Sequence, residues 1–179
     1  MKHLSTGVRN KAKSIVLLLL DVDGVLTDGR IIVDDRGVET KQFHVRDGQG
    51  ISLLMRAGIE VGLITARSSP SVRHRAKELG IRLVRQGVRH KFLAYDEIKR
   101  SRGLADSQIA YVGDDIVDLP ILRIAGLAVT VADGWAELRS AADLVTAAGG
   151  GQGAVREVAE LLLKSQDKWL RVVDELIEK

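Results

Sequence analysis

The feature that most limits the fold of this chain is a run of six apolar residues, Ile15 to Leu20, which ends abruptly at Asp21. A strand that is apolar on both faces belongs in the middle of a parallel sheet, where helices cover both sides. The run is too short to span a membrane, which takes about 20 apolar residues. A secretory signal would not end in acidic residues either. We therefore expect a central strand, no membrane partner and a cytoplasmic location.

Beyond this run, short strand patterns alternate with helical patterns, which indicates repeated strand–helix–strand units and a mostly parallel sheet. Gly37 lies between two short strand patterns and predicts the turn of a β-hairpin at about 30–45. Further strands are predicted at 60–65, 82–85, 109–112, 127–131 and 144–145, and helices near 48–57, 70–79, 90–102, 117–124, 135–140 and 153–177. The length suits one domain, so the sequence predicts a single α/β domain over residues 1–179, with a helical tail at about 153–179.

Composition narrows the kind of ligand. Aromatic residues make up only 3% of the chain, which is few for a protein that stacks on nucleic-acid bases, and the basic residues are not clustered. The net charge of +3 fits either an ordinary basic surface or an anionic small-molecule substrate. The chain has no cysteine, which excludes thiolate metal sites and fits a reducing compartment. We expect a small anionic substrate and no nucleic-acid partner.

Reactive side chains follow the predicted strands. Asp21 and Asp23 follow the first strand, Thr65 ends another, Lys91 opens a helix, and Asp114 follows the strand at 109–112. Ligands bind at the carboxyl ends of parallel strands, so we expect these side chains to meet. Carboxylate oxygens suit Mg²⁺. A nucleophilic carboxylate, a second carboxylate for acid/base work, a hydroxyl, a lysine and a magnesium ligand together are what phosphoryl transfer requires.

These residues lie in segments that resemble the four motifs of the haloacid dehalogenase superfamily of phosphatases. The matching parts are, in order, DVDGVLTDG at 21–29, Thr65 at a strand end, Lys91, and GDDIVDLP at 113–120. HVRDGQGI at 44–51, LITAR at 63–67, GDDIVDLP and GGGQGAVREV at 149–158 resemble the branch that hydrolyses 3-deoxy-D-manno-octulosonate 8-phosphate. The resemblance covers roughly residues 14–166. It implies a cap-less, Rossmann-like, three-layer subunit whose protruding hairpin helps to assemble a homotetramer.

By position, the resemblance assigns a role to each motif residue. Asp21 is the nucleophile and a Mg²⁺ ligand, and Asp23 is the general acid/base with its backbone carbonyl on the metal. Asp114 is the third protein ligand, while Thr65 and Lys91 bind the phosphoryl group. The sugar-acid end of the substrate would contact His44, Val45, Arg46, Asp47, Gly48, Arg67 and Arg75, with Asp115 and Asp118 in support. From the pattern alone, His44, Arg67 and Arg75 fit surface positions equally well, and Asp118 fits a helix N-terminus.

Two positions depart from the family pattern, and several alternatives stay open. Ala66 stands where the family often has glycine, which bears on the position of the neighbouring Arg67. Asp167 stands where the family tail often has glycine, which leaves the role of the tail undecided. The substrate could instead be a nine-carbon N-acylneuraminate 9-phosphate. A non-catalytic binding or regulatory relative is disfavoured because every motif carboxylate is present. A phosphotransferase is disfavoured because the hairpin leaves no room for a large cap that would shield an aspartyl phosphate from water.

Overall fold

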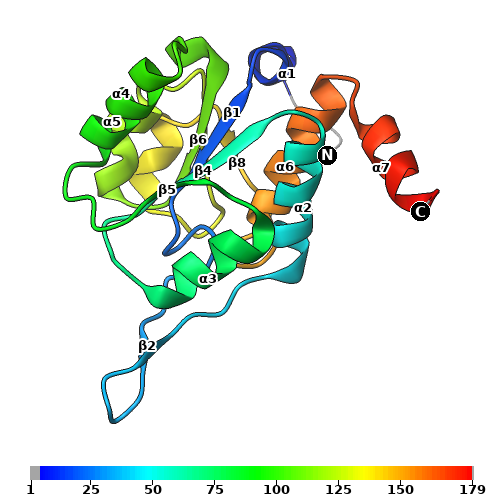
Figure 1. The fold of residues 1–179 in the computed structure, drawn as a ribbon. Coiled ribbons are helices and arrows are strands. Elements are labelled where there is room, and N and C mark those ends of the chain that lie inside the picture. The colour runs from blue at the N-terminus through cyan, green and yellow to red at the C-terminus, as the bar shows by residue number, and fades with distance from the viewer. Residues whose placement is uncertain (1–4, 179) are drawn as a thin grey trace.

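The computed structural model describes residues 5–178 and is built around a six-stranded, wholly parallel sheet (Figure 1). The strand order is β5-β4-β1-β6-β7-β8. The strands are β1 (Leu17–Leu20), β4 (Glu60–Ile64), β5 (Leu83–Arg85), β6 (Ile109–Gly113), β7 (Leu127–Thr130) and β8 (Leu144–Val145). β1 pairs with β4 on one side and β6 on the other, and all its leucines are buried. The predicted central strand is therefore confirmed.

Helices cover both faces of this sheet and produce two separate cores. In β1, Leu18 and Leu20 face one core, whereas Leu17 and Leu19 face the other, as the two-residue period of a strand requires. The first core is covered by α1 (Thr6–Lys13), α2 (Val45–Arg56), α3 (Pro70–Leu79) and α6 (Ala154–Ser165), and the second by α4 (Lys91–Ser101) and α5 (Leu119–Leu122). The three-layer α/β prediction is confirmed (Figure 1).

The hairpin projects away from the sheet (Figure 1). Its strands, β2 (Ile32–Val33) and β3 (Glu39–Thr40), pair antiparallel, and Gly37 adopts the positive φ of +79° that the turn needs. The pairing is shorter than predicted, because it ends at Thr40. The predicted start of the next helix is also wrong, since α2 begins at Val45 rather than near 48. Residues 44–48 thus form the first turn of a helix and its cap, not the end of a strand.

The remaining helical segments differ in detail from the prediction. The predicted helix at 117–124 is a 3₁₀ turn, Ile116–Asp118, followed by α5, and further 3₁₀ turns lie at Asp106–Gln108 and Ala136–Ser140. The helical stretch at 153–177 is two helices, α6 and α7 (Trp169–Ile177), which break at Asp167. Asp167 has a φ of +55°, a left-handed conformation that favours glycine. Among residues 5–178, no helix is long and apolar enough to cross a membrane.

Candidate active site

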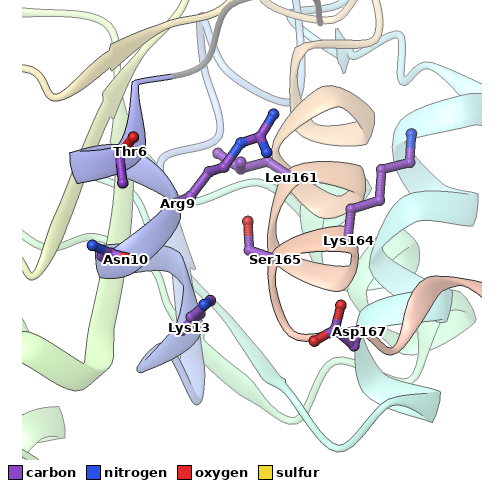
Figure 2. A pocket seen from close by; sticks show the side chains of 8 residues that line it. All are labelled: Thr6, Arg9, Asn10, Lys13, Leu161, Lys164, Ser165 and Asp167. Atoms are coloured by element: carbon purple, nitrogen blue, oxygen red, sulfur yellow. The ribbon is translucent and has the colours of Figure 1, made fainter.

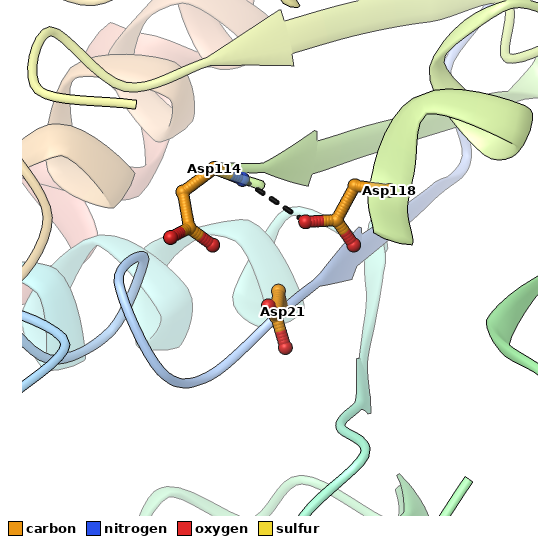
Figure 3. Close-up of side chains that lie close together, drawn as sticks. All are labelled: Asp21, Asp114 and Asp118. Carbon is orange, nitrogen blue, oxygen red and sulfur yellow. Dashed lines mark hydrogen bonds between the residues drawn. The ribbon is translucent and has the colours of Figure 1, made fainter. Parts of the chain in front are cut away.

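Three carboxylates meet where β1 and β6 end (Figure 3). Asp21 directly follows β1, Asp114 directly follows β6, and Asp118 lies one turn further along the chain. One oxygen from each of the three lies within 4.8 Å of the others. The parallel register explains the meeting, since Leu20 pairs with Val112 and brings the two strand ends level. The predicted convergence of Asp21 and Asp114 is present in the structure.

Lys91 supplies the positive charge that this cluster needs. It is the first residue of α4, and its buried ammonium Nζ lies 2.7 Å from Oδ2 of Asp21 and 2.7 Å from Oδ1 of Asp118. Burial lowers the pKa of Lys91, but the two carboxylates outweigh burial and raise that pKa above its ordinary value. The lysine therefore stays charged and can neutralise a phosphoryl group brought to Asp21.

Asp118 organises the site rather than offering a free ligand atom. It is fully buried, and its Oδ1 accepts hydrogen bonds from Lys91 and from the Tyr111 hydroxyl, the latter at 2.6 Å. Its Oδ2 accepts a hydrogen bond of 3.0 Å from Asp114 N–H (Figure 3) and one of 3.2 Å from Asp115 N–H. These four bonds fix the loop after β6. The role of Tyr111 was not predicted from the sequence, although a tyrosine in an otherwise aliphatic strand is a signal of a buried polar contact. The side chain of Asp115 is exposed and caps the next turn through Ile116 N–H.

Asp21 and Asp114 carry negative charge that the described residues do not fully compensate. Burial, followed by repulsion from Asp118, raises the pKa of Asp21 to about 6. Burial, followed by repulsion from Asp21 and Asp118, raises the pKa of Asp114 to about 8. Within residues 5–178, the buried Oδ1 of Asp114 has no hydrogen-bond partner. The unpartnered Oδ1 of Asp114 lies beside Asp21, a second carboxylate whose pKa is raised. Such a pair fits a hard divalent cation, which would supply the missing positive charge and a partner for the oxygen.

Gly24 allows the first loop to approach Asp114 this closely. A Cβ atom at position 24 would lie 1.9 Å from Oδ2 of Asp114, and the backbone there has a φ of +87°. A side chain would therefore push the two strand-end loops apart. The glycine in the first motif is required by this contact.

Thr65 lies at the end of β4, beside β1, with its side chain buried. Its hydroxyl oxygen accepts a hydrogen bond of 3.3 Å from Arg67 N–H. In the described part of the chain no hydrogen bond uses the Thr65 hydroxyl as a donor, so its hydrogen is available to a phosphoryl oxygen.

Asp23 contacts the base of the hairpin, which the sequence analysis did not predict. Its Oδ1 pairs with the ammonium of Lys41, and its Oδ2 lies 4.0 Å from Nε of Arg67. Glu39 joins both cations, at 2.6 Å from Arg67 Nη2 and 3.3 Å from Lys41 Nζ. Burial raises the pKa of Glu39, but the hydrogen bond from Arg67 and the charge of Lys41 outweigh it and lower that pKa. The sequence offered one signal of this contact, namely a lysine at the point where the hairpin ends and the chain returns to the α/β domain.

The residues expected at the sugar-acid end divide into two groups. His44 is the N-cap residue of α2, and its buried Nδ1 has no hydrogen-bond partner in residues 5–178. Val45, with 81% of its surface exposed, and Arg46 lie on the open first turn of α2. These three are free to contact a ligand. Asp47 is not, because its buried carboxylate accepts hydrogen bonds from Gly153 N–H at 3.2 Å and Arg156 N–H at 2.8 Å.

Asp47 therefore holds the start of α6, as a capping carboxylate does. Arg75 lies on α3, 2.9 Å from Glu78, and packs so closely on Gly48 that a Cβ atom there would lie 2.3 Å from its Nη2. In this structure Arg75 and Gly48 join α3 to α2. Arg75 lies with Glu78 and Gly48 along a cavity of about 270 Å³.

A cavity of about 440 Å³ lies between α1 and α6, as Figure 2 shows. It is lined by Thr6, Arg9, Asn10, Lys13, Leu161, Lys164, Ser165 and Asp167. The neighbouring Gln166 donates hydrogen bonds to the carbonyls of Ala12 and Ile15, just before β1. This cavity thus lies at the amino ends of the strands, away from the carboxylate cluster.

The chain is similar to known hydrolases in sequence and in fold. A model of haloacid dehalogenase-like hydrolases matches residues 81–156. The chain is 46% identical over 165 residues to the 3-deoxy-D-manno-octulosonate 8-phosphate phosphatase of Salmonella typhi, which covers 92% of this chain and 88% of the relative. The crystal structure of the Yersinia pestis enzyme of that name matches with a TM-score of 0.90 at 44% identity, over 91% of this chain and 88% of that one.

A third match comes from Moraxella catarrhalis. That phosphatase, solved with magnesium ion, phosphate ion and the sugar acid KDO, matches with a TM-score of 0.92 at 43% identity, over 94% of this chain and 97% of that one. The fold and the strand-end carboxylates define a haloacid dehalogenase-like hydrolase. Within that class, the chain belongs to the family of the 3-deoxy-D-manno-octulosonate 8-phosphate phosphatases.

Proposed function

We propose that this protein is a Mg²⁺-dependent phosphatase that hydrolyses 3-deoxy-D-manno-octulosonate 8-phosphate to the free sugar acid and phosphate. The observation that carries the proposal is the convergence of Asp21, Asp114 and Lys91 at the carboxyl ends of β1 and β6. The identity to phosphatases of that substrate, over most of both chains, supports the substrate class. We also propose that residues 1–179 work as one hydrolase domain.

We propose one chemical task for each of these residues. Asp21 attacks phosphorus and forms an aspartyl phosphate, while Asp23 protonates the departing sugar oxygen. Asp23 then takes a proton from a water molecule whose oxygen attacks phosphorus. The bond between phosphorus and Asp21 breaks, phosphate leaves and the Asp21 carboxylate is restored. Lys91 and the Thr65 hydroxyl bind the phosphoryl oxygens as charge moves onto them.

The proposed metal ligands are Asp21, Asp114 and the backbone carbonyl of Asp23. A bound Mg²⁺ supplies positive charge that lets two buried carboxylates ionise side by side and neutralises the phosphoryl group. The unpartnered Oδ1 of Asp114 supports this assignment. Asp118 supports the site through Lys91, and exposed Asp115 through its turn.

For the sugar-acid end, we propose contacts with His44, Val45, Arg46 and Arg67, which are free or partly exposed. An arginine suits the substrate because the sugar acid carries a carboxylate besides its phosphate. Asp47, Gly48 and Arg75 would shape this end by fixing α2 against α6 and α3.

We further propose a homotetramer assembled through the hairpin. Its exposed apolar side chains are Ile31, Ile32, Val33 and Val38, of which Ile31 is 63% exposed. Apolar surface that is concentrated on a projecting segment is typical of a protein interface. Light scattering of the wild type and of Ile31→Lys tests this proposal, with a tetramer that dissociates as the expected result. The cytoplasmic location stays a prediction that cell fractionation can test.

The decisive experiment is phosphate release from a panel of phosphomonoesters that includes the eight-carbon and nine-carbon sugar acid phosphates. We expect release that needs Mg²⁺, stops with a chelator and favours the eight-carbon substrate. Preference for the N-acylneuraminate 9-phosphate would replace the substrate but keep the chemistry. No release from any ester, together with no binding of Mg²⁺, would leave a non-catalytic relative as the better account.

A further inference from the structure

The base of the hairpin contributes a buried lysine to the catalytic centre. The side chain of Lys41 is only 1% exposed, yet it lies in the segment that connects the projecting hairpin to α2. A buried ammonium is costly unless carboxylates compensate it. Asp23 and Glu39 both do so here. An arrangement this costly, placed on the proposed acid/base, calls for a functional explanation.

The contacts divide the two oxygens of Asp23 between different partners. Lys41 donates a hydrogen bond to Oδ1, whereas no hydrogen bond from the described residues reaches Oδ2, which lies 4.0 Å from Nε of Arg67. Oδ2 is therefore the oxygen that can exchange a proton with a leaving group or with water. Glu39 contacts Lys41 and Arg67 together, so it holds both cations in place around Asp23.

We propose that Lys41 is a positioning residue for Asp23, and that Glu39 fixes Lys41 in this role, so the hairpin base is part of the catalytic apparatus. The inference rests on the proposed phosphatase function. Lys41 orients the Asp23 carboxylate so that Oδ2 faces the bridging oxygen of the substrate. The proton passes from Oδ2 to that oxygen when the bond to phosphorus breaks, and returns to Oδ2 from the attacking water.

The test compares two leaving groups in Lys41→Met. A sugar alkoxide needs the proton of Asp23 in order to leave, whereas 4-nitrophenolate leaves without one. Misplacing a catalytic group by about 1 Å costs about 10²-fold in rate. We therefore expect kcat/KM for the sugar acid phosphate to fall about 10²-fold in Lys41→Met. For 4-nitrophenyl phosphate kcat/KM should fall less than about threefold, because acid catalysis contributes its factor of about 10² or more only where the leaving group needs a proton.

Two further variants separate positioning from a general structural role. If Lys41 acts through Asp23, the double variant Lys41→Met/Asp23→Asn should be no slower than Asp23→Asn alone. Glu39→Gln should show the same dependence on the leaving group to a smaller degree, and it serves if Lys41→Met does not fold. Arg36→Met is the matched control, because Arg36 lies on the same hairpin and pairs only with Asp34 among the described residues.

The outcomes are distinguishable from failure of the proposed function. A wild type that releases no phosphate would overturn both the function and this inference. With an active wild type, equal losses for the two substrates, or additive losses in the double variant, would overturn the role of Lys41 alone.

Discussion

Removing the metal should make the stability of this protein fall as the pH rises from 6 to 8. A chelator removes the Mg²⁺ that we propose to bind between Asp21 and Asp114. Both carboxyl groups have folded-state pKa values above the ordinary 3.8, at about 6 and about 8, chiefly because they are buried. The native state therefore binds more protons than the unfolded state, so its stability is greatest at low pH and is lost as the pH rises through those values.

The size of this loss of stability depends on how many more protons the native state binds than the unfolded state. Both carboxyl groups contribute to the loss between about pH 4 and 6, and mainly one of the pair between pH 6 and 8. One extra proton on the native state gives a slope of about 1.4 kcal/mol per pH unit, so the upper window costs up to about 3 kcal/mol. For a chain of this length that corresponds to a fall in Tm of roughly 5–10 °C.

The assay is thermal unfolding at pH 6, 7 and 8, with chelator and with excess Mg²⁺. Mg²⁺ should raise Tm most at pH 8 and flatten the slope, because the cation binds the ionised pair. Asp114→Asn should lose both the slope and the stabilisation by Mg²⁺, while Asp35→Asn, on the exposed hairpin, should behave as the wild type. If the Tm of the chelated protein is constant or rises between pH 6 and 8, the pKa values of Asp21 and Asp114 are not raised in the folded state.

Three substitutions test the supporting structure. Lys91→Met leaves Asp21 and Asp118 without their shared cation, so we expect a loss of about 3–5 kcal/mol in denaturant unfolding at pH 8, and no turnover; a loss below about 1 kcal/mol would contradict the ion-pair assignment. Asp47→Ala removes the cap of α6 and should cost about 1–2 kcal/mol by the same assay, whereas an unchanged midpoint would exclude the capping role. Asp167→Gly relieves a left-handed backbone and should raise stability by up to about 1 kcal/mol, and a clear loss would show that its side chain matters more than its φ.

The sequence predicts the sheet and the meeting of Asp21 with Asp114 well, for a physical reason. The apolar run that forms β1 allows only a central strand, and β4, β6 and β7 in the same sheet are buried over nearly their whole length. Once the strands are parallel, Asp21, Thr65 and Asp114 must lie at one edge. Local pattern and tertiary structure agree in this region, so the expected convergence is found.

The hairpin base could not be predicted in the same way. The sequence predicts the hairpin as far as residue 45, but strand pairing ends at Thr40 and a helix starts at Val45. The role of Lys41 depends on a contact with Asp23, 18 positions earlier, which no local pattern encodes. Similarly, Asp47 caps a helix that begins more than 100 residues later, and its contact appears only once α2 packs on α6.

The central claim is that Asp21 forms a covalent bond to the phosphoryl group. The most direct measurement is acid quenching of the enzyme during turnover with Mg²⁺ and the eight-carbon sugar acid phosphate, followed by mass spectrometry of the peptide that contains Asp21. We expect a peptide heavier by one phosphoryl group in the wild type, and neither that adduct nor phosphate release in a folded Asp21→Asn variant. Sustained phosphate release by Asp21→Asn, or a phosphoryl group on another residue, would contradict it.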